Sequence, residues 1–413
     1  MVIYNSVVSI YGLAIRAAAI RKEKARKWVQ GRQNWRFDLQ KKINELGDAP
    51  RIWFHCASYG EFEQGRPLIE LIRQKYPRYK IILSFFSPSG YEAFKNYKGA
   101  EVICYLPLDS DRSAKDFINL VKPQQAIFVK YEFWLHFLFE LKRQNIPTYL
   151  VSATFKAHHP FFKWYGRIFR RSLLSFNKIF LQDENSVSLL KGIGINNVVV
   201  AGDTRFDRVI EIMQDFKGFE DIKKFKGDGF LIVAGSTWPK DDDLLLEIFL
   251  ELAGQNVKMI IAPHELDPGS VLRLKQKIDS KKISCSFYSQ GINEKVSLLI
   301  LDKMGMLSRL YYHGDAAYIG GGFNDGIHNT LEPAVYGMPV FFYGQDFHKY
   351  NEAVKMVKLG VAVNILTKEQ LSELIRSYIR DKNKRSATRE TLKSFFDQNT
   401  NVSERILREI DLS

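Results

Sequence analysis

The chain has 413 residues, a hydrophobic share of 46% and a formal net charge of +14. This length exceeds one ordinary core and predicts two domains, while the absence of long low-complexity tracts excludes a disordered or fibrous protein. The positive charge calls for an anionic partner: a nucleic acid, an anionic membrane or a phosphorylated substrate. The three cysteines are far apart and form no CxxC pair, which predicts reduced, buried thiols.

The N-terminal segment, residues 1–36, is predicted to associate with a membrane. Residues 2–20 are mainly apolar, and a basic cluster follows them directly: Arg21, Lys22, Lys24, Arg26, Lys27, Arg32 and Arg36. This order is typical of a contact on the cytoplasmic side of a membrane. Arg16 interrupts the apolar stretch. A helix that lies in the membrane interface therefore fits this sequence at least as well as a helix that spans the membrane. A helix packed on the first domain is the structural alternative.

From residue 52 onward, short apolar runs alternate with helical patterns, which predicts parallel strands joined by helical crossovers. In the first domain, residues 37–208, we expect strands at 52–57, 81–86, 101–105, 126–129, 148–151, 178–181 and 198–201. Amphipathic helices are expected between them, at 62–73, 114–121 and 133–143.

A polar, lysine-rich interval at residues 203–228 is expected to contain the domain boundary. The second domain, residues 209–413, has candidate strands at 231–234, 259–262, 298–301, 316–319 and 340–342. One long helix over 384–410 is predicted to close it. The fold class is therefore α/β, with two Rossmann-like domains whose strand-end loops face a central cleft. Other two-domain proteins share this alternation, which predicts architecture and not function.

The first chemical signal is Ser58-Tyr59-Gly60-Glu61, directly after a predicted strand. A carboxylate at such a strand end can accept a proton from a hydroxyl nucleophile. An acidic residue that complements the dipole of the next helix is the commoner alternative.

The second signal is the segment 320–333, GGGFNDGIHNTLEP, after another predicted strand. A helix beginning near Asn329 or Thr330 would present free N–H groups to a phosphate, and Glu332 could accept hydrogen bonds from ribose hydroxyls. The segment matches neither the dinucleotide GxGxxG nor the P-loop pattern, which weakens the case for NAD or ATP. A structural glycine turn is the alternative.

Three further loops follow predicted strands of the second domain. They are residues 235–237, the tripeptide Pro263-His264-Glu265 and the tripeptide Met304-Gly305-Met306. The hydroxyls and amides of residues 235–237 would suit a phosphate. The imidazole of His264 would suit a base or a ribose, and the two methionines would suit a nucleobase. Each signal is weak alone, and His264 is more often a structural histidine; their convergence on one set of strand ends is the stronger argument.

Two DxD segments, 109–111 and 241–243, resemble the metal-binding motif of other sugar transferases. Each begins a helical pattern, where capping already explains acidic residues, and no HExxH or paired Cys/His spacing occurs. We therefore expect no metal site. The stretch 157–171, AHHPFFKWYGRIFRR, mixes aromatic and basic residues and suits a lipid head group. An amphipathic helix with a basic edge is the alternative, and no RNA-binding signature accompanies the stretch.

Taken together, these segments resemble the Kdo transferases of lipopolysaccharide synthesis, which add 3-deoxy-D-manno-octulosonic acid (Kdo) to a lipid A precursor. The matching segments are Trp53-Phe54-His55, Ser58-x-Gly60-Glu61, Arg66-Pro67-Leu68, Glu132-Phe133-Trp134, Gly202-x-x-Arg205-Phe206-Asp207, Ser236-Thr237, Met304-Gly305 and His328-Asn329-x-Leu331-Glu332-Pro333. The first and last are the most specific. The chain departs from the family pattern at Lys130, Arg205, His264, Met306 and Gly326-Ile327.

The resemblance implies a GT-B fold, CMP-Kdo as donor, inversion at the anomeric carbon, and no metal or other cofactor. It implies that Glu61 is the general base and that Glu132 and Arg205 organise the transition state. The first domain would bind the acceptor and the second the CMP. The implied CMP contacts are Pro263, His264, Met304, Gly305, Met306, Asn329, Thr330, Leu331 and Glu332.

The implied partners are CMP-Kdo, a lipid A precursor such as lipid IVA and the anionic surface of the inner membrane, on its cytoplasmic side; nucleic acid is not among them. Two alternatives stay open. One is a GT-B transferase that uses a UDP-sugar on another lipid acceptor. The other is a non-catalytic, membrane-bound protein that binds a sugar nucleotide or a lipid phosphate.

Overall fold

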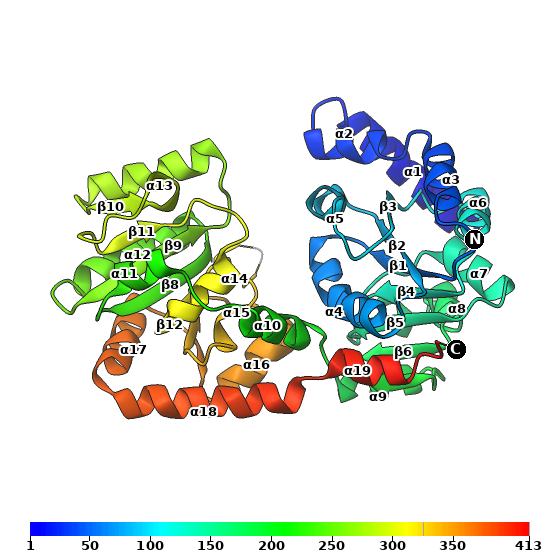
Figure 1. The fold of residues 1–413 in the computed structure, drawn as a ribbon. Coiled ribbons are helices and arrows are strands. Elements are labelled where there is room, and N and C mark those ends of the chain that lie inside the picture. The colour runs from blue at the N-terminus through cyan, green and yellow to red at the C-terminus, as the bar shows by residue number, and fades with distance from the viewer. Residues whose placement is uncertain (325, 413) are drawn as a thin grey trace. The chain divides into compact units, whose positions relative to one another are not determined.

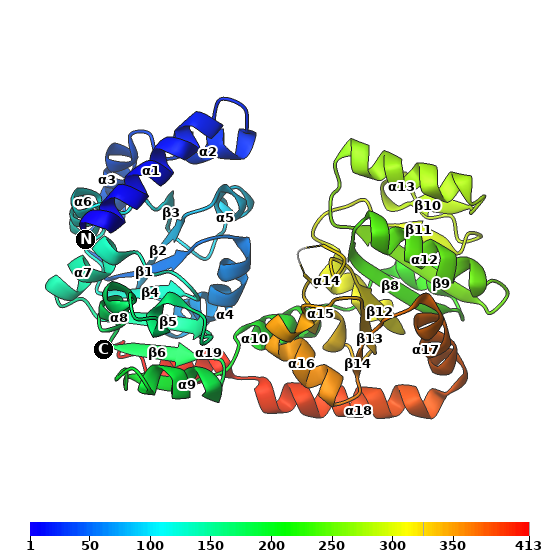
Figure 2. The ribbon, with the colours of Figure 1, turned by 180° about the vertical axis from the view of Figure 1, so that it is seen from behind.

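The structure, a computed structural model, describes residues 1–324 and 326–412. It divides into two compact units: unit 1 comprises Met1–Arg208 and Asn399–Ser413, and unit 2 comprises Val209–Gln398. Each unit contains its own seven-stranded sheet flanked by helices (Figures 1 and 2). The expected pair of parallel Rossmann-like domains is confirmed.

The sheet of unit 1 has the order β3-β2-β1-β4-β5-β6-β7, and all its strand pairs are parallel. Its strands are β1 Arg51–Cys56, β2 Lys80–Phe85, β3 Val102–Tyr105, β4 Gln125–Val129, β5 Thr148–Ala153, β6 Lys178–Leu181 and β7 Val198–Val200. The order reverses between β1 and β4, where Ile52 is in register with both Ile81 and Gln125. Ligands of doubly wound sheets bind outside the carboxyl ends of the strands at such a reversal.

Helices cover both faces of this sheet because successive strand residues point to opposite sides. Trp53 belongs to a core cluster with α3, α6, α7 and α8, whereas its neighbours Ile52 and Phe54 pack with α4 and α19 on the other side. The helices of unit 1 are α1 Val2–Ala18, α2 Glu23–Gln30, α3 Trp35–Asn44, α4 Tyr59–Lys75, α5 Pro88–Phe94, α6 Asp111–Val121, α7 Leu135–Arg143, α8 Arg167–Leu173, α9 Glu184–Lys191 and α19 Val402–Arg408. Helix α10 Arg205–Gln214 begins in unit 1 and continues into unit 2.

The sheet of unit 2 has the order β10-β11-β9-β8-β12-β13-β14 and is also parallel throughout. Its strands are β8 Phe230–Thr237, β9 Val257–Pro263, β10 Cys285–Phe287, β11 Leu298–Ile300, β12 Ala316–Ile319, β13 Val340–Phe342 and β14 Ala362–Asn364. The strand order reverses between β8 and β12, so the loops after these strands lie at the switch point.

One face of this second sheet packs against α12, α13 and α17. The helices of unit 2 are α11 Glu220–Lys226, α12 Pro239–Glu251, α13 Pro268–Ser280, α14 Leu307–Leu310, α15 Leu331–Ala334, α16 Asn351–Lys358, α17 Lys368–Arg380 and α18 Lys382–Asn399. The polar interval 203–228 contains α10 and α11, which the sequence pattern did not predict, and β10 and β14 are three-residue strands that the pattern also missed.

The single closing helix predicted over 384–410 is wrong. The chain breaks between α18 and α19 at Asn401, which adopts a left-handed conformation with φ of 61°. The carboxylate of Asp207 then accepts hydrogen bonds from the backbone N–H groups of Val402 (3.2 Å) and Ser403 (2.7 Å). Because these contacts and the packing on α4 hold α19, the last helix belongs to unit 1 and not to the second domain (Figure 1).

The N-terminal helix α1 packs on unit 1 with one face and exposes apolar residues on the other. On the inner face, Tyr4 donates a hydrogen bond to Asp109, and Val8 and Gly12 are buried. The exposed apolar side chains are Val2, Ile3, Val7, Ile10 and Leu13. Among the described residues, we find no helix with both the length and the apolar character needed to cross a membrane.

Candidate active site

Glu61 lies at the switch point of unit 1. Strand β1 ends at Cys56, and α4 begins three residues later at Tyr59, which places Glu61 in the first helical turn. The side chain of Glu61 is half-buried and accepts a hydrogen bond from the hydroxyl of Ser58, the residue before the helix. The helix start therefore orients the carboxylate at the carboxyl edge of the sheet, as the sequence predicted.

Glu132 follows β4, the neighbouring strand across the same switch point. Its side chain is 8% exposed, and one carboxylate oxygen, Oε2, lies 2.6 Å from the indole Nε1 of Trp134 and 2.9 Å from Nε2 of His55. A buried carboxylate is costly unless such donors satisfy it. Two donors, one indole and one imidazole, therefore hold Glu132 in one orientation.

A chain of hydrogen bonds extends from Glu132 into the sheet. The fully buried His55 approaches the hydroxyl of Ser84 with Nδ1 at 2.8 Å, and the indole N–H of Trp53 donates to the same hydroxyl at 2.8 Å. If Ser84 donates to Nδ1, the other ring nitrogen of His55 carries the proton and donates to Glu132. This tautomer satisfies every member of the chain. Sequence reasoning assigned no role to His55 or Ser84, because their pairing across β1 and β2 requires the sheet.

The two glutamates lie close enough to act on a common neighbour. Burial raises the pKa of the Cys56 thiol well above its ordinary value, and the charges of Glu61 and Glu132 add to this effect. Cys56 is the last residue of β1, so both carboxylates surround the end of the central strand. The structure thus brings together two candidate residues that are 71 positions apart in the sequence.

Arg205, the third candidate, belongs to the same edge of unit 1. Its guanidinium forms an ion pair with Asp203, with Nη2 and Oδ2 2.6 Å apart. The hydroxyl of Thr204 donates to the carbonyl of Gln64 in α4 at 2.6 Å. Burial raises the pKa of the Tyr131 phenol, and the charges of both Arg205 and Glu61 act on it. The contact of Thr204 with α4 therefore places Arg205 close to the helix that carries Glu61.

In unit 2, Asp241 joins the loops that follow the two switch-point strands. Its carboxylate accepts hydrogen bonds from the Trp238 backbone N–H (2.9 Å), the Gly321 backbone N–H (3.0 Å) and the Tyr318 hydroxyl (2.7 Å). The side chain is fully buried, and burial raises its pKa. Asp241 is thus a structural link between the β8 and β12 loops. The sequence analysis assigned it only a helix-capping role.

Three aromatic side chains stack beside this link. The ring of His264 stacks on those of Trp238, with centroids 4.9 Å apart, and His328, with centroids 4.4 Å apart, and the indole N–H of Trp238 donates to Nε2 of His328 at 3.3 Å. Burial lowers the pKa of His328 to about 4, with a further contribution from His264. The His328 ring is therefore neutral at pH 7. The stack brings together loops from β8, β9 and β12, as the sequence predicted for His264 but not for Trp238.

The glycines after β12 serve close packing. A side chain on Gly320 would collide with the backbone of Ser236 and Thr237, and one on Gly322 would overlap the carbonyl oxygen of Tyr343. Close approach of protein backbone therefore requires these two glycines, which supports the structural alternative for them.

The helix expected near Asn329 or Thr330 begins at Leu331 and is only four residues long. A helix this short has a weak dipole, so an anion at its start would be bound mainly by individual backbone N–H groups. The side chains of Thr330 and Leu331 are buried, so these residues can present only their backbone to a ligand. Asn329 donates to Glu332 at 3.1 Å, and Glu332 is half-buried.

The loop with Met304, Gly305 and Met306 follows β11 at the same edge of the sheet. Met304 is 84% exposed, whereas Met306 is buried at the start of α14. The hydroxyl of Tyr311, just after α14, occupies the position that a side chain on Gly235 would take, and the side chain of Leu307 lies next to it. Of the two methionine side chains, only that of Met304 is open to a ligand.

A sign of function that no sequence pattern revealed is backbone strain at the strand ends. Lys130 after β4, Ser152 in β5 and Ser236 in β8 all have positive φ, at 69°, 55° and 54°. Non-glycine residues rarely adopt this conformation, and such outliers concentrate at functional sites. Lys130 and Ser236 lie at the switch points of their sheets.

Two further sequence candidates are the acidic segment 109–111, which has a structural explanation, and the stretch 157–171, which lies apart from the switch points. Asp109 accepts hydrogen bonds from Tyr4 and from the backbone N–H groups of His136 and Phe137, each of the latter two at 3.2 Å. In the stretch 157–171, Phe161 is buried and Trp164 is 91% exposed. The expected lipid contact of this stretch stays a prediction.

Comparison with known proteins agrees with this geometry. The family profile described as 3-deoxy-D-manno-octulosonic-acid transferase (kdotransferase) matches residues 30–208. The 3-deoxy-D-manno-octulosonic acid transferase of Aquifex aeolicus (strain VF5) is 30% identical over 326 residues, which cover 78% of this chain and 83% of that protein. The enzyme of the same name from Chlamydia trachomatis serovar A is 29% identical over 384 residues, or 89% of this chain and 86% of that protein.

A solved structure shows the same fold at low identity. The UDP-GlcNAc 2-epimerase from Neisseria meningitidis covers 87% of this chain and 98% of its own, with a TM-score of 0.61 and 14% identity. This likeness supports the two-domain architecture alone. The length and identity of the match to the Aquifex aeolicus enzyme show that the chain belongs to the Kdo transferase family of glycosyltransferases.

Proposed function

We propose that this enzyme transfers Kdo from CMP-Kdo to a hydroxyl group of a lipid A precursor, lipid IVA, with inversion at the anomeric carbon. The observation that carries the proposal is the pair of carboxylates around the end of β1. Glu61 is half-buried and held by Ser58, while Glu132 is buried and held by Trp134 and His55. Two carboxylates in unlike environments suit two unlike roles.

Glu61 is the proposed general base. A sugar hydroxyl is a weak nucleophile and needs a positioned acceptor for its proton as the new glycosidic bond forms. The half-buried Glu61 has a free approach to a substrate, whereas the hydrogen bonds of Glu132 are directed to protein groups. In the direct displacement, the base takes the acceptor proton and CMP leaves from the opposite side of the anomeric carbon, which inverts the configuration.

Glu132 and Arg205 are proposed to organise the transition state. The anomeric carbon develops positive charge as CMP departs, and a fixed carboxylate such as Glu132 stabilises such charge. Arg205 supplies a cation for the negative charge of the leaving phosphate or of the Kdo carboxylate. Its pairing with Asp203 keeps the guanidinium in a defined orientation before the substrate binds.

The loops at the carboxyl edge of unit 2 are proposed to hold the CMP. The exposed ring of His264, which stacks on Trp238 and His328, suits contact with a base or ribose face. Glu332 suits the ribose hydroxyls. The backbone N–H of Thr330 suits the phosphate, whereas that of Leu331 already donates to the side chain of Asn329 at 3.1 Å.

The enzyme is proposed to work at the cytoplasmic side of the inner membrane. The outer face of α1 carries exposed Val2, Ile3, Val7 and Ile10, and basic residues follow the helix directly. An apolar helix face beside positive charge suits an anionic bilayer surface. A lipid acceptor would be reached at the same surface.

The test is transfer of Kdo from freshly generated CMP-Kdo to lipid IVA by the wild type, Glu61→Gln and Glu92→Gln. The last variant removes a carboxylate from an exposed i,i+3 ion pair with Lys95, so it serves as a matched control. We expect Glu61→Gln to lose transfer about 100-fold or more, with CMP affinity retained, and Glu92→Gln to match the wild type.

Equal activity of Glu61→Gln and the wild type would remove Glu61 from the role of base. Absence of product with every protein, each folded, would overturn the proposed donor and acceptor. In that case UDP-sugars are the next donors to examine.

A further inference from the structure

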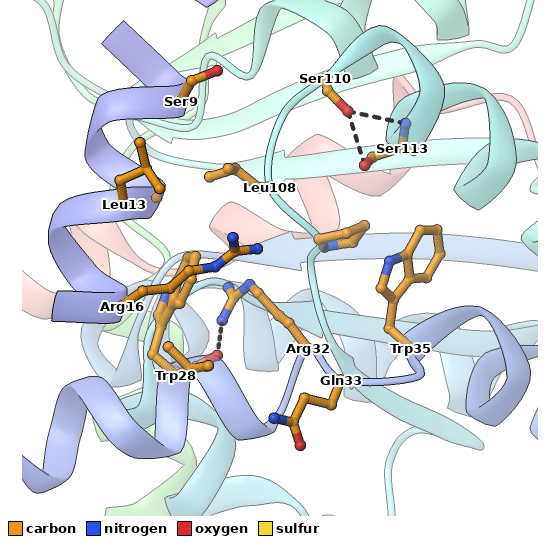
Figure 3. Close-up of a pocket in the computed structure, with 13 residues that line it drawn as sticks. Ser9, Leu13, Arg16, Trp28, Arg32, Gln33, Trp35, Leu108, Ser110 and Ser113 are labelled. Carbon is orange, nitrogen blue, oxygen red and sulfur yellow. Dashed lines mark hydrogen bonds between the residues drawn. The ribbon is translucent and has the colours of Figure 1, made fainter. Parts of the chain in front are cut away.

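A cavity of about 730 Å³ lies in unit 1 between α1, α2 and the loop from β3 to α6 (Figure 3). Its lining includes two arginines, two tryptophans and apolar residues of α1 and of that loop. The members that matter here are Leu13, Arg16, Trp28, Arg32, Trp35 and Leu108. Of the described residues that line the cavity, none is an aspartate or a glutamate. The cavity is therefore cationic and partly apolar.

Arg32 is a partly buried cation held by carbonyl groups. Its Nε, Nη1 and Nη2 atoms donate to the carbonyl oxygens of Leu106 (2.8 Å), Trp28 (3.0 Å) and Phe86 (2.7 Å). The guanidinium carbon also lies 3.8 Å from the centroid of the Trp28 ring. These bonds use three of the five N–H groups of the guanidinium, which leaves two for a ligand.

Arg32 is positively charged at neutral pH although no carboxylate of the described residues lines the cavity. Burial lowers the pKa of its guanidinium from 12.5 to about 9, so the group stays charged at neutral pH. A partly buried charge that is stabilised by carbonyl dipoles and by the rings of Trp28, Phe86 and Tyr105 gains from an added anion.

Arg16 provides the second charge. Its side chain extends from α1 into the cavity toward the guanidinium of Arg32 (Figure 3). Within the described part of the chain, Arg16 has neither a hydrogen bond nor an ion pair of its own. Two like charges directed toward one another repel, and an anion between them removes the repulsion. A phosphate suits this position because it can accept hydrogen bonds from both guanidinium groups.

The walls of the cavity indicate that this phosphate is part of an amphiphile. Leu13 and Leu108 lie beside the two arginines, and the rings of Trp28 and Trp35 lie on either side of Arg32 (Figure 3). Leu13 also belongs to the exposed apolar face of α1. A ligand with a phosphate beside hydrocarbon or sugar would match both parts of the lining.

The cavity is connected to Glu132 through two aromatic residues. The carbonyl of Phe86 accepts a hydrogen bond from Arg32, and the ring of Phe86 packs on that of Trp134 with centroids 4.4 Å apart. Trp134 in turn donates to Glu132. All these groups lie at the carboxyl edge of one sheet, so one extended ligand can contact both places.

We propose that the cavity between Arg16 and Arg32 binds a phosphate group of the acceptor lipid and so sets the specificity for a phosphorylated acceptor. This inference rests on the proposed function and adds the subsite that recognises the acceptor. Arg16 and Arg32 bind the phosphate, while the apolar walls contact the adjoining sugar or acyl chain. The sugar hydroxyl that reacts is then directed toward Glu61.

The experiment measures steady-state transfer in nonionic detergent micelles, where an anionic bilayer makes no contribution. The variants are Arg16→Gln and the matched control Arg21→Gln, an exposed residue of the same basic segment that does not line the cavity. We expect Arg16→Gln to raise KM for the bisphosphorylated acceptor about tenfold, because one charge-assisted hydrogen bond is lost. The values of kcat and of KM for CMP-Kdo should stay within twofold, as should every parameter of Arg21→Gln.

A second arm uses the two acceptors that each lack one phosphate. The acceptor that lacks the phosphate bound between Arg16 and Arg32 should have a higher KM with the wild type than the bisphosphorylated acceptor. Its KM should not rise further with Arg16→Gln. An unchanged acceptor KM for Arg16→Gln, or an equal increase for both variants, would overturn the proposal while transfer itself continues. Failure of the wild type to transfer Kdo at all would instead contradict the proposed function.

Discussion

The Nε2 atom of His55 lies 2.9 Å from Oε2 of Glu132, although 77 residues separate the two in the sequence. The contact crosses from β1 to the loop after β4, and these strands are neighbours at the switch point. It turns a carboxylate on a strand-end loop into a fixed group. A charged group stabilises a transition state best when hydrogen bonds already hold it in place before the substrate binds.

Glu132→Gln should lower kcat for Kdo transfer about 100-fold. Glutamine keeps the size of the side chain but removes the charge that is proposed to stabilise the transition state. The measurement is steady-state transfer with KM for each substrate, and Glu140→Gln is the control. Glu140 is also buried, but it pairs with Arg143 within α7, so its variant should retain activity. Equal kcat values for the two variants would contradict the role of Glu132.

Asp241→Ala should destabilise the protein by about 3 kcal/mol or more, because it leaves three buried donors without an acceptor. Asp243→Ala, two residues later in the same acidic run, should change the free energy of unfolding by less than about 1 kcal/mol, since Asp243 is exposed and pairs with Lys277 at the surface. Urea denaturation of unit 2, followed by tryptophan fluorescence, would measure both. Similar midpoints for the two variants would show that Asp241 is not the link between the β8 and β12 loops.

The stability of unit 2 should depend on pH through Asp242. Burial raises the pKa of this carboxyl from 3.8 to about 6, so the native state resists its ionisation. The contribution of the group to stability is intact below pH 4 and is lost as the pH rises from about 4 to about 6. Asp242→Asn should therefore gain up to about 3 kcal/mol over the wild type at pH 7, with the gain absent at pH 3.5. Urea midpoints at several pH values would check this, and a gain independent of pH would contradict it.

His264→Ala should weaken CMP binding about tenfold, because it removes the exposed ring that stacks on both Trp238 and His328. Isothermal titration with CMP gives the affinity directly. His348→Ala is the matched control, since His348 is exposed and outside the stack. If both variants bind CMP like the wild type, the stack is a structural feature of unit 2 only.

Sequence periodicity predicted most of the fold because each strand and helix leaves a local pattern. The twelve predicted strands are all present, since buried parallel strands are continuous apolar runs. The missed strands β10 and β14 lie at the edges of their sheet, and their sequences, CSF and AVN, include polar residues, so they lack a continuous apolar run. The break before α19 was missed because a left-handed Asn401 and the cap from Asp207 depend on residues far apart in the sequence.

The sequence by itself determined which residues are available for the chemistry: Glu61, Glu132 and Arg205 lie in motifs that follow predicted strands. Only the tertiary structure decided how they are held and what accompanies them. The bond from His55 to Glu132, the link through Asp241 and the cavity between Arg16 and Arg32 each join segments from different strands or helices. Hydrogen bonds and charge interactions act over a few ångströms, so they exist only once the sheet has brought distant segments together.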